Sequence, residues 1–197
     1  PAAGGRLRAN FICAIGASTG GTEAIKDVLM TLPKQAPPIV VTQHIPASFS
    51  TSFAERLNSC CTINVFEAED GQPIRAGCAY IAPGDKHLIV GRSSYGYVCK
   101  LLGGDPVNRH KPAVEVLFDS VLSEAGNKSL AVMLTGMGAD GAQAMLSMRE
   151  AGCRTIAQDE ATSVVWGMPG AAVKLGAADE VLPLGKIAER IMRVAYD

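Results

Sequence analysis

The sequence predicts an α/β fold with a three-layer, mostly parallel, doubly wound sheet, helices on both faces and an inserted antiparallel β-hairpin region. Short apolar runs alternate with segments in which apolar residues recur every three to four positions, the pattern of strands joined by helices. In the middle of the chain, four short runs follow one another with turn residues between them. With 197 residues, 48% of them hydrophobic, the chain is long enough to bury the core of one domain.

The apolar pattern predicts each element in order. The first βα units are a strand over 11–15, a helix over 22–32 that Pro33 ends, a strand over 39–42 and a helix over 49–57. One or two antiparallel hairpins are predicted by the runs at 62–66, 78–82, 88–91 and 96–101. The remaining elements are helices over 114–122, 142–151, 169–175 and 187–195, which alternate with strands over 129–134, 154–157 and 180–182.

The composition argues against several classes of protein. Eighteen Lys and Arg against nineteen Asp and Glu leave a net charge of −1, without the basic excess of a nucleic-acid-binding surface. No apolar run reaches the ~18–20 residues of a membrane helix and no signal peptide opens the chain, so we expect a cytoplasmic protein without membrane insertion. The six cysteines form no Cys-x-x-Cys pair, which argues against a zinc site and for reduced thiols.

The first ten residues differ from the rest. Their sequence, which opens Pro-Ala-Ala-Gly-Gly-Arg-Leu-Arg, has the composition of a linker. It is either an arbitrary boundary or the remnant of a connection to an upstream domain. We expect a linker over 1–10 and a single domain over 11–197.

A glycine-rich loop, Gly16-Ala-Ser-Thr-Gly-Gly21, lies between the first strand and the first helix. It fits G-x-S-x-G, in which a sharp turn exposes a serine hydroxyl above the sheet and the helix N-terminus offers amide donors to an oxyanion. Ser18 is therefore a candidate nucleophile. An ordinary βα loop with Ser18 as the helix cap stays an alternative.

Two further loops follow strands that we expect at the same edge of the sheet. His44 comes just after the second strand, where its imidazole is suited to accept the hydroxyl proton of Ser18. Asp140, in Thr135-Gly-Met-Gly-Ala-Asp-Gly141, follows another strand and is suited to orient His44. The carboxyl ends of parallel strands meet at one edge, so these side chains are expected to converge.

The third loop has a rival interpretation. Gly136, Gly138 and Gly141 satisfy G-x-G-x-x-G, and Asp159 follows the next strand, as in a dinucleotide-binding fingerprint. Asp140 argues against it, because its charge would lie beside the bound pyrophosphate. A dinucleotide-dependent oxidoreductase therefore stays open as an alternative function.

The other two histidines do not follow an evident core strand. His87 lies after a turn and is expected to be structural. His110, in Asn108-Arg-His-Lys-Pro112, lies in a basic loop. There we expect a solvated surface, with contact to an acidic partner as the alternative. His44 is accordingly preferred as the base.

Taken together, these motifs resemble those of a known family, the catalytic (C-terminal) domain of the bacterial chemotaxis response-regulator protein-glutamate methylesterases. The resemblance runs from Phe11 almost to the end of the chain. It is carried, in order, by Ile15-Gly-Ala-Ser-Thr-Gly-Gly-Thr22, Gln43-His44, Ile81-Ala-Pro-Gly-Asp-Lys-His87, Asn108-Arg-His110, Leu134-Thr-Gly-Met-Gly-Ala-Asp-Gly141, Ala157-Gln-Asp-Glu-Ala-Thr162 and Gly167-Met-Pro169. The chain departs from the family pattern at Trp166, often Phe, and at Gly170, often a basic residue.

The resemblance implies that residues 11–197 are a serine hydrolase domain. It would remove methyl groups from glutamyl γ-methyl esters on chemoreceptors, releasing methanol, and deamidate particular receptor glutamines during adaptation in bacterial chemotaxis. The resemblance makes Ser18, His44 and Asp140 the catalytic triad. It also gives Thr19 a place beside the nucleophile and the Met137 backbone N–H a role at the oxyanion. This chemistry needs no metal or cofactor.

The resemblance also implies partners. They are the methylated cytoplasmic helices of chemoreceptors, an N-terminal receiver domain that blocks the site until it is phosphorylated, and the kinase that supplies the phosphoryl group. Nothing in the sequence requires more than a monomer. A non-catalytic receptor-binding module, whose serine loop is only a helix cap, stays a further alternative.

Overall fold

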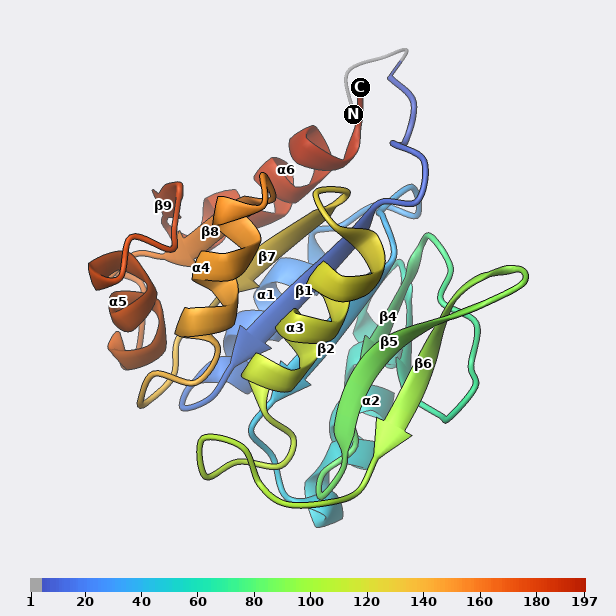
Figure 1. Cartoon of the computed structure of the whole chain (residues 1–197), viewed down its shortest axis with the longest axis horizontal. Helices are drawn as coiled ribbons and strands as arrows, with labels where there is room; N and C mark the ends of the chain where they lie inside the picture. The colour runs from blue at the N-terminus through green and yellow to red at the C-terminus, as the bar shows by residue number, and fades with distance from the viewer. Residues whose placement is uncertain (1–4) are drawn as a thin grey trace.

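A seven-stranded, fully parallel sheet forms the centre of the fold (Figure 1). The structure, a computed structural model, describes residues 5–197. The strand order is β3-β4-β2-β1-β7-β8-β9, with β5 and β6 in a separate antiparallel pair. The elements in chain order are β1 (Ile12–Ala17), α1 (Gly21–Met30), β2 (Ile39–Gln43), α2 (Ala47–Cys60), β3 (Asn64–Glu67), β4 (Cys78–Ile81), β5 (His87–Ser93), β6 (Gly96–Leu102), α3 (Val114–Ala125), β7 (Ser129–Met133), α4 (Ala142–Glu150), β8 (Arg154–Gln158), α5 (Gly167–Lys174), β9 (Glu180–Leu182) and α6 (Leu184–Ala195).

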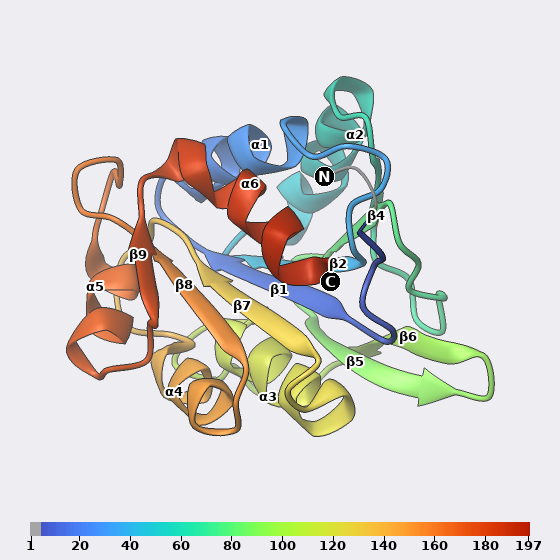
Figure 2. The same cartoon turned by 90° about the horizontal axis from the view of Figure 1, so that it is seen from above.

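Both faces of the sheet are covered, which explains why its central strands are fully buried and mostly apolar. Alternate residues of β1 belong to two cores: Cys13 and Ile15 face α1, α2 and α6, whereas Ile12 and Ala14 face α3, α4, α5 and the β5–β6 hairpin. Figure 2 shows these two layers on either side of the sheet. The predicted three-layer fold with an inserted hairpin is therefore confirmed.

The middle of the chain contains one hairpin, not two. Only β5 and β6 pair antiparallel, whereas β3 and β4 extend the main sheet in parallel. The link between β3 and β4 returns along β6, where Ile74 N donates to Tyr97 O at 3.0 Å and Cys99 N donates to Gln72 O at 2.8 Å. Strand pairing of this kind depends on contacts between distant segments, so the local pattern does not distinguish it from a second hairpin.

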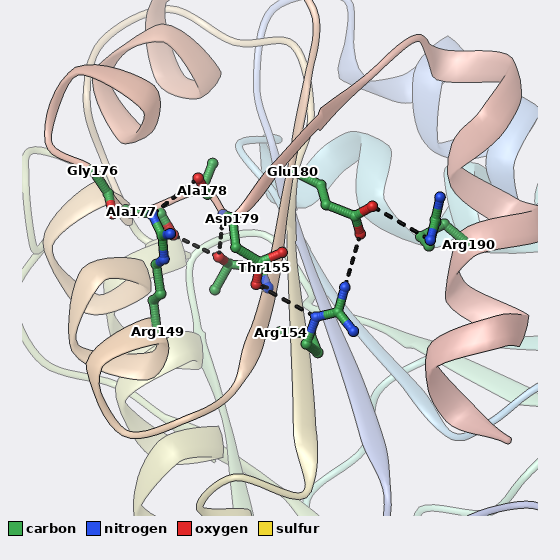
Figure 3. A network of polar contacts seen from close by, with 9 residues as sticks. All are labelled: Arg149, Arg154, Thr155, Gly176, Ala177, Ala178, Asp179, Glu180 and Arg190. Carbon is green, nitrogen blue, oxygen red and sulfur yellow. Dashed lines mark hydrogen bonds and ion pairs between the residues drawn. The ribbon is translucent and has the colours of Figure 1, made fainter. Parts of the chain in front are cut away.

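The amino ends of β8 and β9 are joined to α6 by polar contacts (Figure 3). Glu180 accepts from Arg154 at 3.2 Å and pairs with Arg190 at 3.4 Å. Beside them, Thr155 Oγ1 donates to Ala177 O at 2.6 Å. These contacts stabilise the edge of the sheet at β9. They lie at the amino ends of the strands, whereas the loops that carry Ser18 and Asp140 lie at the carboxyl ends.

Residues 5–10 lie along the end of α6. Leu7 forms a bridge with Tyr196, and Arg8 N donates to Ala195 O at 2.9 Å. Residues 1–4 of the expected linker lie outside the described residues. Among the helices that are described, none is long and apolar enough to cross a bilayer.

The strand order also determines where a site can form. From β1 the chain continues through α1 to β2 on one side, whereas from β7 it continues through α4 to β8 on the other. In doubly wound sheets, the crevice at such a switch point, outside the carboxyl ends of the strands, is where ligands bind. Ser18, His44 and the loop from Leu134 to Gly141 follow β1, β2 and β7 at this edge.

Candidate active site

The backbone of Ser18 is held from both sides. Its N–H donates to Thr135 O at 2.9 Å, and its carbonyl accepts from Gly21 N at 2.7 Å. The N-cap of α1 is Gly20, at φ 79°, and no side chain caps this helix. The interpretation of Ser18 as a helix cap is therefore wrong. Within residues 5–197 the Ser18 hydroxyl has no hydrogen-bond partner, so the structure shows no hydrogen bond between it and His44.

His44 lies at the end of the strand next to Ser18. Ala17 pairs with Gln43 in the β1–β2 register, and His44 N donates to Ala17 O at 3.1 Å. The Gln43 amide donates to Ser18 O at 2.8 Å and to His44 O at 3.2 Å, so one side chain holds the backbones of both residues. The sequence motif contains Gln43, but only the structure reveals this role.

His44 and Asp140 form a close pair. His44 Nε2 lies 2.7 Å from Asp140 Oδ2, and the two side chains are only 8% and 1% exposed. The hydrogen on Nε2 is required for this bond, so the lone pair is on Nδ1. Nδ1 is buried and has no partner among residues 5–197. His44 Nδ1 is therefore available to accept a proton, and His44 lies at the end of the strand next to the Ser18 loop.

Asp140 also accepts hydrogen bonds from the N-terminus of α3. Its oxygens accept four in total, from His44 Nε2 at 2.7 Å, Asn108 Nδ2 at 2.9 Å, Val114 N at 2.7 Å and Glu115 N at 3.1 Å. Burial raises the pKa of the Asp140 carboxyl, but these hydrogen bonds outweigh burial and hold the pKa below its ordinary value. Asp140 is therefore ionised at neutral pH, as an orienting carboxylate must be.

The lowered pKa of Asp140 predicts a pH-dependent stability. The contribution of the ionised group is fully present above the unfolded pKa of about 3.9 and is lost as the pH falls through the lower folded pKa. We expect the difference in free energy of unfolding between wild type and Asp140→Asn to shrink between about pH 6 and about pH 3, as measured by urea unfolding. A difference that stays constant over this range would contradict the prediction.

Gly136 lies directly against the nucleophile. A Cβ atom there would lie 2.5 Å from Met168 Sδ, 2.8 Å from Ser18 Cβ and 2.9 Å from Ser18 N, closer than such atoms approach. The next residue, Met137, has an exposed side chain, and its N–H has no acceptor in the part of the chain that the structure describes. Thr19 is exposed beside Ser18. Thr19 thus lies in the loop of the nucleophile, and Met137 lies in the loop that packs against it.

Gly136→Ala is expected to disable the site without unfolding the protein. The added methyl group pushes against Met168 on one side and Ser18 on the other, and a shift of Ser18 by about 1 Å costs about 10²-fold in rate. Ester hydrolysis and circular dichroism measure the two effects. Gly103→Ala is a matched control, because nothing lies within 4 Å of a Cβ at that position. Equal activity of both variants would contradict a tight contact between the two loops.

The structure favours the triad interpretation over the dinucleotide fingerprint. The Asp140 carboxylate binds to α3 and His44 rather than facing the start of α4. Asp159, the acidic residue of the fingerprint, closes a local turn by accepting from Thr162 N at 3.0 Å and from Thr162 Oγ1 at 2.6 Å. No group of three potential metal-binding side chains lies together within residues 5–197.

The two remaining histidines have different environments. His87 is buried, with Nε2 on Asp105 O at 2.9 Å and Nδ1 accepting from Ala113 N at 3.2 Å, so the structural role expected for it is confirmed. The basic composition of its loop predicts that His110 is solvated, and this prediction is wrong. Its ring stacks on that of His44 with the centroids 3.5 Å apart. The approach of two loops far apart in sequence leaves no local signal, so the pattern misses it.

Trp166 and Gly170 are coupled through packing. Trp166 Nε1 donates to Gln158 O at 2.8 Å, which fixes the indole. A Cβ atom at Gly170 would lie 3.0 Å from Cε3 of this ring and 3.2 Å from Cδ2. A side chain at position 170 would therefore crowd the indole, which glycine avoids.

Comparisons with known proteins show what the chain is similar to. The protein-glutamate methylesterase/protein-glutamine glutaminase 2 of Saccharophagus degradans is 64% identical over 189 residues, which is 96% of this chain and 54% of that protein. The protein-glutamate methylesterase/protein-glutamine glutaminase of Hydrogenovibrio crunogenus is 63% identical over 181 residues, which is 92% of this chain and 48% of that protein. The chain thus spans about half the length of these relatives.

A solved structure and a family model also match most of the chain. The crystal structure of the Thermotoga maritima CheB methylesterase catalytic domain superposes with a TM-score of 0.91 at 40% identity, over 95% of this chain and 100% of that one. The family model described as CheB methylesterase matches residues 13–191. With Ser18, His44 and Asp140 inside this match, the chain belongs to the CheB methylesterase family.

Proposed function

We propose that this chain hydrolyses γ-methyl esters of glutamyl side chains on chemoreceptors, with Ser18 as nucleophile, His44 as general base and Asp140 as its orienting partner. The observation that carries the proposal is the 2.7 Å pair between His44 and Asp140, buried beside the Ser18 loop at the switch point of the sheet. The names of the relatives, protein-glutamate methylesterase and protein-glutamine glutaminase, support this choice of substrate.

The geometry suggests which nitrogen of His44 moves the proton. Nε2 is engaged by Asp140, so Nδ1 takes the hydroxyl proton as Ser18 Oγ forms a bond to the ester carbonyl carbon. The tetrahedral intermediate collapses when Nδ1 returns that proton to the methoxy oxygen, which breaks the C–O bond and releases methanol. Water then cleaves the glutamyl-enzyme by the same proton path. With a glutamine substrate, the same steps release ammonia.

The oxyanion is stabilised by backbone donors. We assign this role to the Met137 N–H, which has no acceptor within residues 5–197 and follows the glycine packed on Ser18. Thr19, adjacent to the nucleophile, contributes to substrate binding. Neither residue needs a metal or a cofactor to act.

The surroundings of the site suit a protein substrate. Phe49, Met137 and Val164, each at least 60% exposed, lie on segments that follow β2, β7 and β8 at the same edge of the sheet. A cavity of about 370 Å³ beside His44 is lined by Thr22, Ile45, Phe49, Ser52, Phe53 and Arg56. On this proposal these exposed apolar side chains contact the receptor segment that carries the ester.

We further propose a regulated, cytoplasmic context. The relatives are about twice as long as this chain, and residues 1–10 have the composition of a linker. On this proposal an N-terminal receiver domain precedes the linker and blocks the site until a kinase phosphorylates it. The chain acts as a monomer on receptor helices in the cytoplasm.

Methanol release from methylated chemoreceptor tests the proposed function. The chain is expected to release methanol from methylated receptor but not from receptor that was never methylated. Folded protein that releases none would contradict esterase activity, and titration with NAD(P) would then test the oxidoreductase alternative.

A further inference from the structure

A strained turn next to the active site contains Asn108 and Arg109. Val107 and His110 exchange two backbone hydrogen bonds of 2.9 Å, which close the turn between β6 and α3. Asn108 and Arg109 have φ values of 52° and 69°. Positive φ at two successive residues other than glycine is costly, and such strain persists where the surrounding structure requires it.

The first side chain of the turn binds the orienting carboxylate. Asn108 Nδ2 donates to Asp140 Oδ1 at 2.9 Å, on the opposite oxygen from the one that binds His44. The backbone of α3 supplies the other two donors to Asp140. Asn108 is the only one of the four donors that belongs to the turn, and it restricts rotation of the carboxylate about its own axis.

The last residue of the turn covers the face of the base. The rings of His110 and His44 are nearly parallel, with an interplanar angle of 9° and centroids 3.5 Å apart. Asp140 holds the edge of the His44 ring and His110 covers its face. Tilting of the His44 ring would break either the 2.7 Å bond or the stack.

The charge state of His110 suits this position. Burial lowers the pKa of His110 and nearby His44 lowers it further, while Asp140 raises it in part. His44 and Asp140 are the titratable groups that act on it, and the net effect keeps His110 neutral at neutral pH. A neutral ring can cover an imidazolium as it forms, whereas a charged one would repel it.

We propose that the turn over residues 107–110 is a positioning device for the general base, in which His110 fixes the plane of the His44 ring and Asn108 fixes the Asp140 carboxylate. Both are positioning residues, since they act through His44 and Asp140. This inference rests on the proposed function for the identity of the ester. Its basis, the geometry around His44, is independent of the ester.

Three variants of the full chain test the device. His110→Ala removes the stack and is expected to lower kcat about tenfold, with KM within about twofold, because the base is misaligned but binding is unchanged. His110→Phe keeps a flat ring and is expected to restore kcat to within about threefold of wild type. Asn108→Ala, which removes one of the two hydrogen bonds that Asp140 Oδ1 accepts, is expected to lower kcat about tenfold as well.

Arg109→Asn is the matched control. Arg109 makes no side-chain hydrogen bond or ion pair within the described residues, and asparagine tolerates a positive φ well. Its activity is expected to match wild type. If Arg109→Asn lost as much activity as His110→Ala, any disturbance of the turn would explain the effect, and the proposal would be overturned. The proposal would also be overturned if His110→Ala kept wild-type activity, or if His110→Phe were as inactive as His110→Ala.

Labelling of Ser18 by a fluorophosphonate separates this inference from the proposed function. The labelling rate depends on the base but not on the natural substrate, so it is expected to fall in His110→Ala and to recover in His110→Phe. Wild type that is labelled but releases no methanol would contradict the methylesterase while the variants still test the turn. Wild type that is not labelled would overturn both. Melting temperatures confirm that each variant is folded.

Discussion

Replacing Ser18 by alanine is expected to lower kcat for ester hydrolysis by about 10⁶-fold, the scale measured when the nucleophile of a serine triad is removed. The residual rate comes from the oxyanion donors and from binding. The Ser18 hydroxyl makes no hydrogen bond within residues 5–197, so the variant is expected to keep the stability of wild type. Methanol release from methylated receptor, followed with purified wild type and variant, measures the loss.

Ser59→Ala controls for the substitution itself. Ser59 is an exposed serine on α2 whose hydroxyl donates to Arg56 O at 2.7 Å, and its replacement is expected to leave kcat unchanged. A rate for Ser18→Ala within tenfold of wild type, from protein that melts normally, would show that another residue is the nucleophile.

Asp140→Asn is expected to have the second largest effect, about 10⁴-fold on kcat, because the amide no longer selects the reactive tautomer of the base. This variant is also expected to lose stability. Both carboxylate oxygens accept a backbone N–H, from Val114 on one side and Glu115 on the other. Whichever way the new amide turns, its NH₂ group faces a donor, and a buried unpaired N–H costs about 1–3 kcal/mol.

Urea unfolding and single-turnover kinetics separate the two effects of Asp140→Asn. Asp27→Asn makes the same chemical change at an exposed position on α1 and is expected to alter neither stability nor rate. A variant at position 140 that loses stability but keeps wild-type kcat would show that Asp140 caps α3 without orienting His44.

The local pattern of the sequence was sufficient to predict the elements and the three loops. Apolar runs such as the one over 39–41 predict buried strands, because a strand covered on both faces has few positions that suit a polar side chain. Parallel strands joined by helices bring their carboxyl ends to one edge. The candidate residues Ser18, His44 and Asp140 could therefore be named before any contact was known.

Contacts between distant segments were decided only by the tertiary structure. The pairing of β3 with β4 depends on a link that lies along β6, and the stack of His110 on His44 brings together residues 66 positions apart. The choice of Nε2 for Asp140, which leaves Nδ1 as the base, follows from the packing of α3. The period of the apolar residues predicts which face of a helix or strand is buried. It does not predict which buried side chains contact one another, because those contacts depend on how all the elements of the chain pack together.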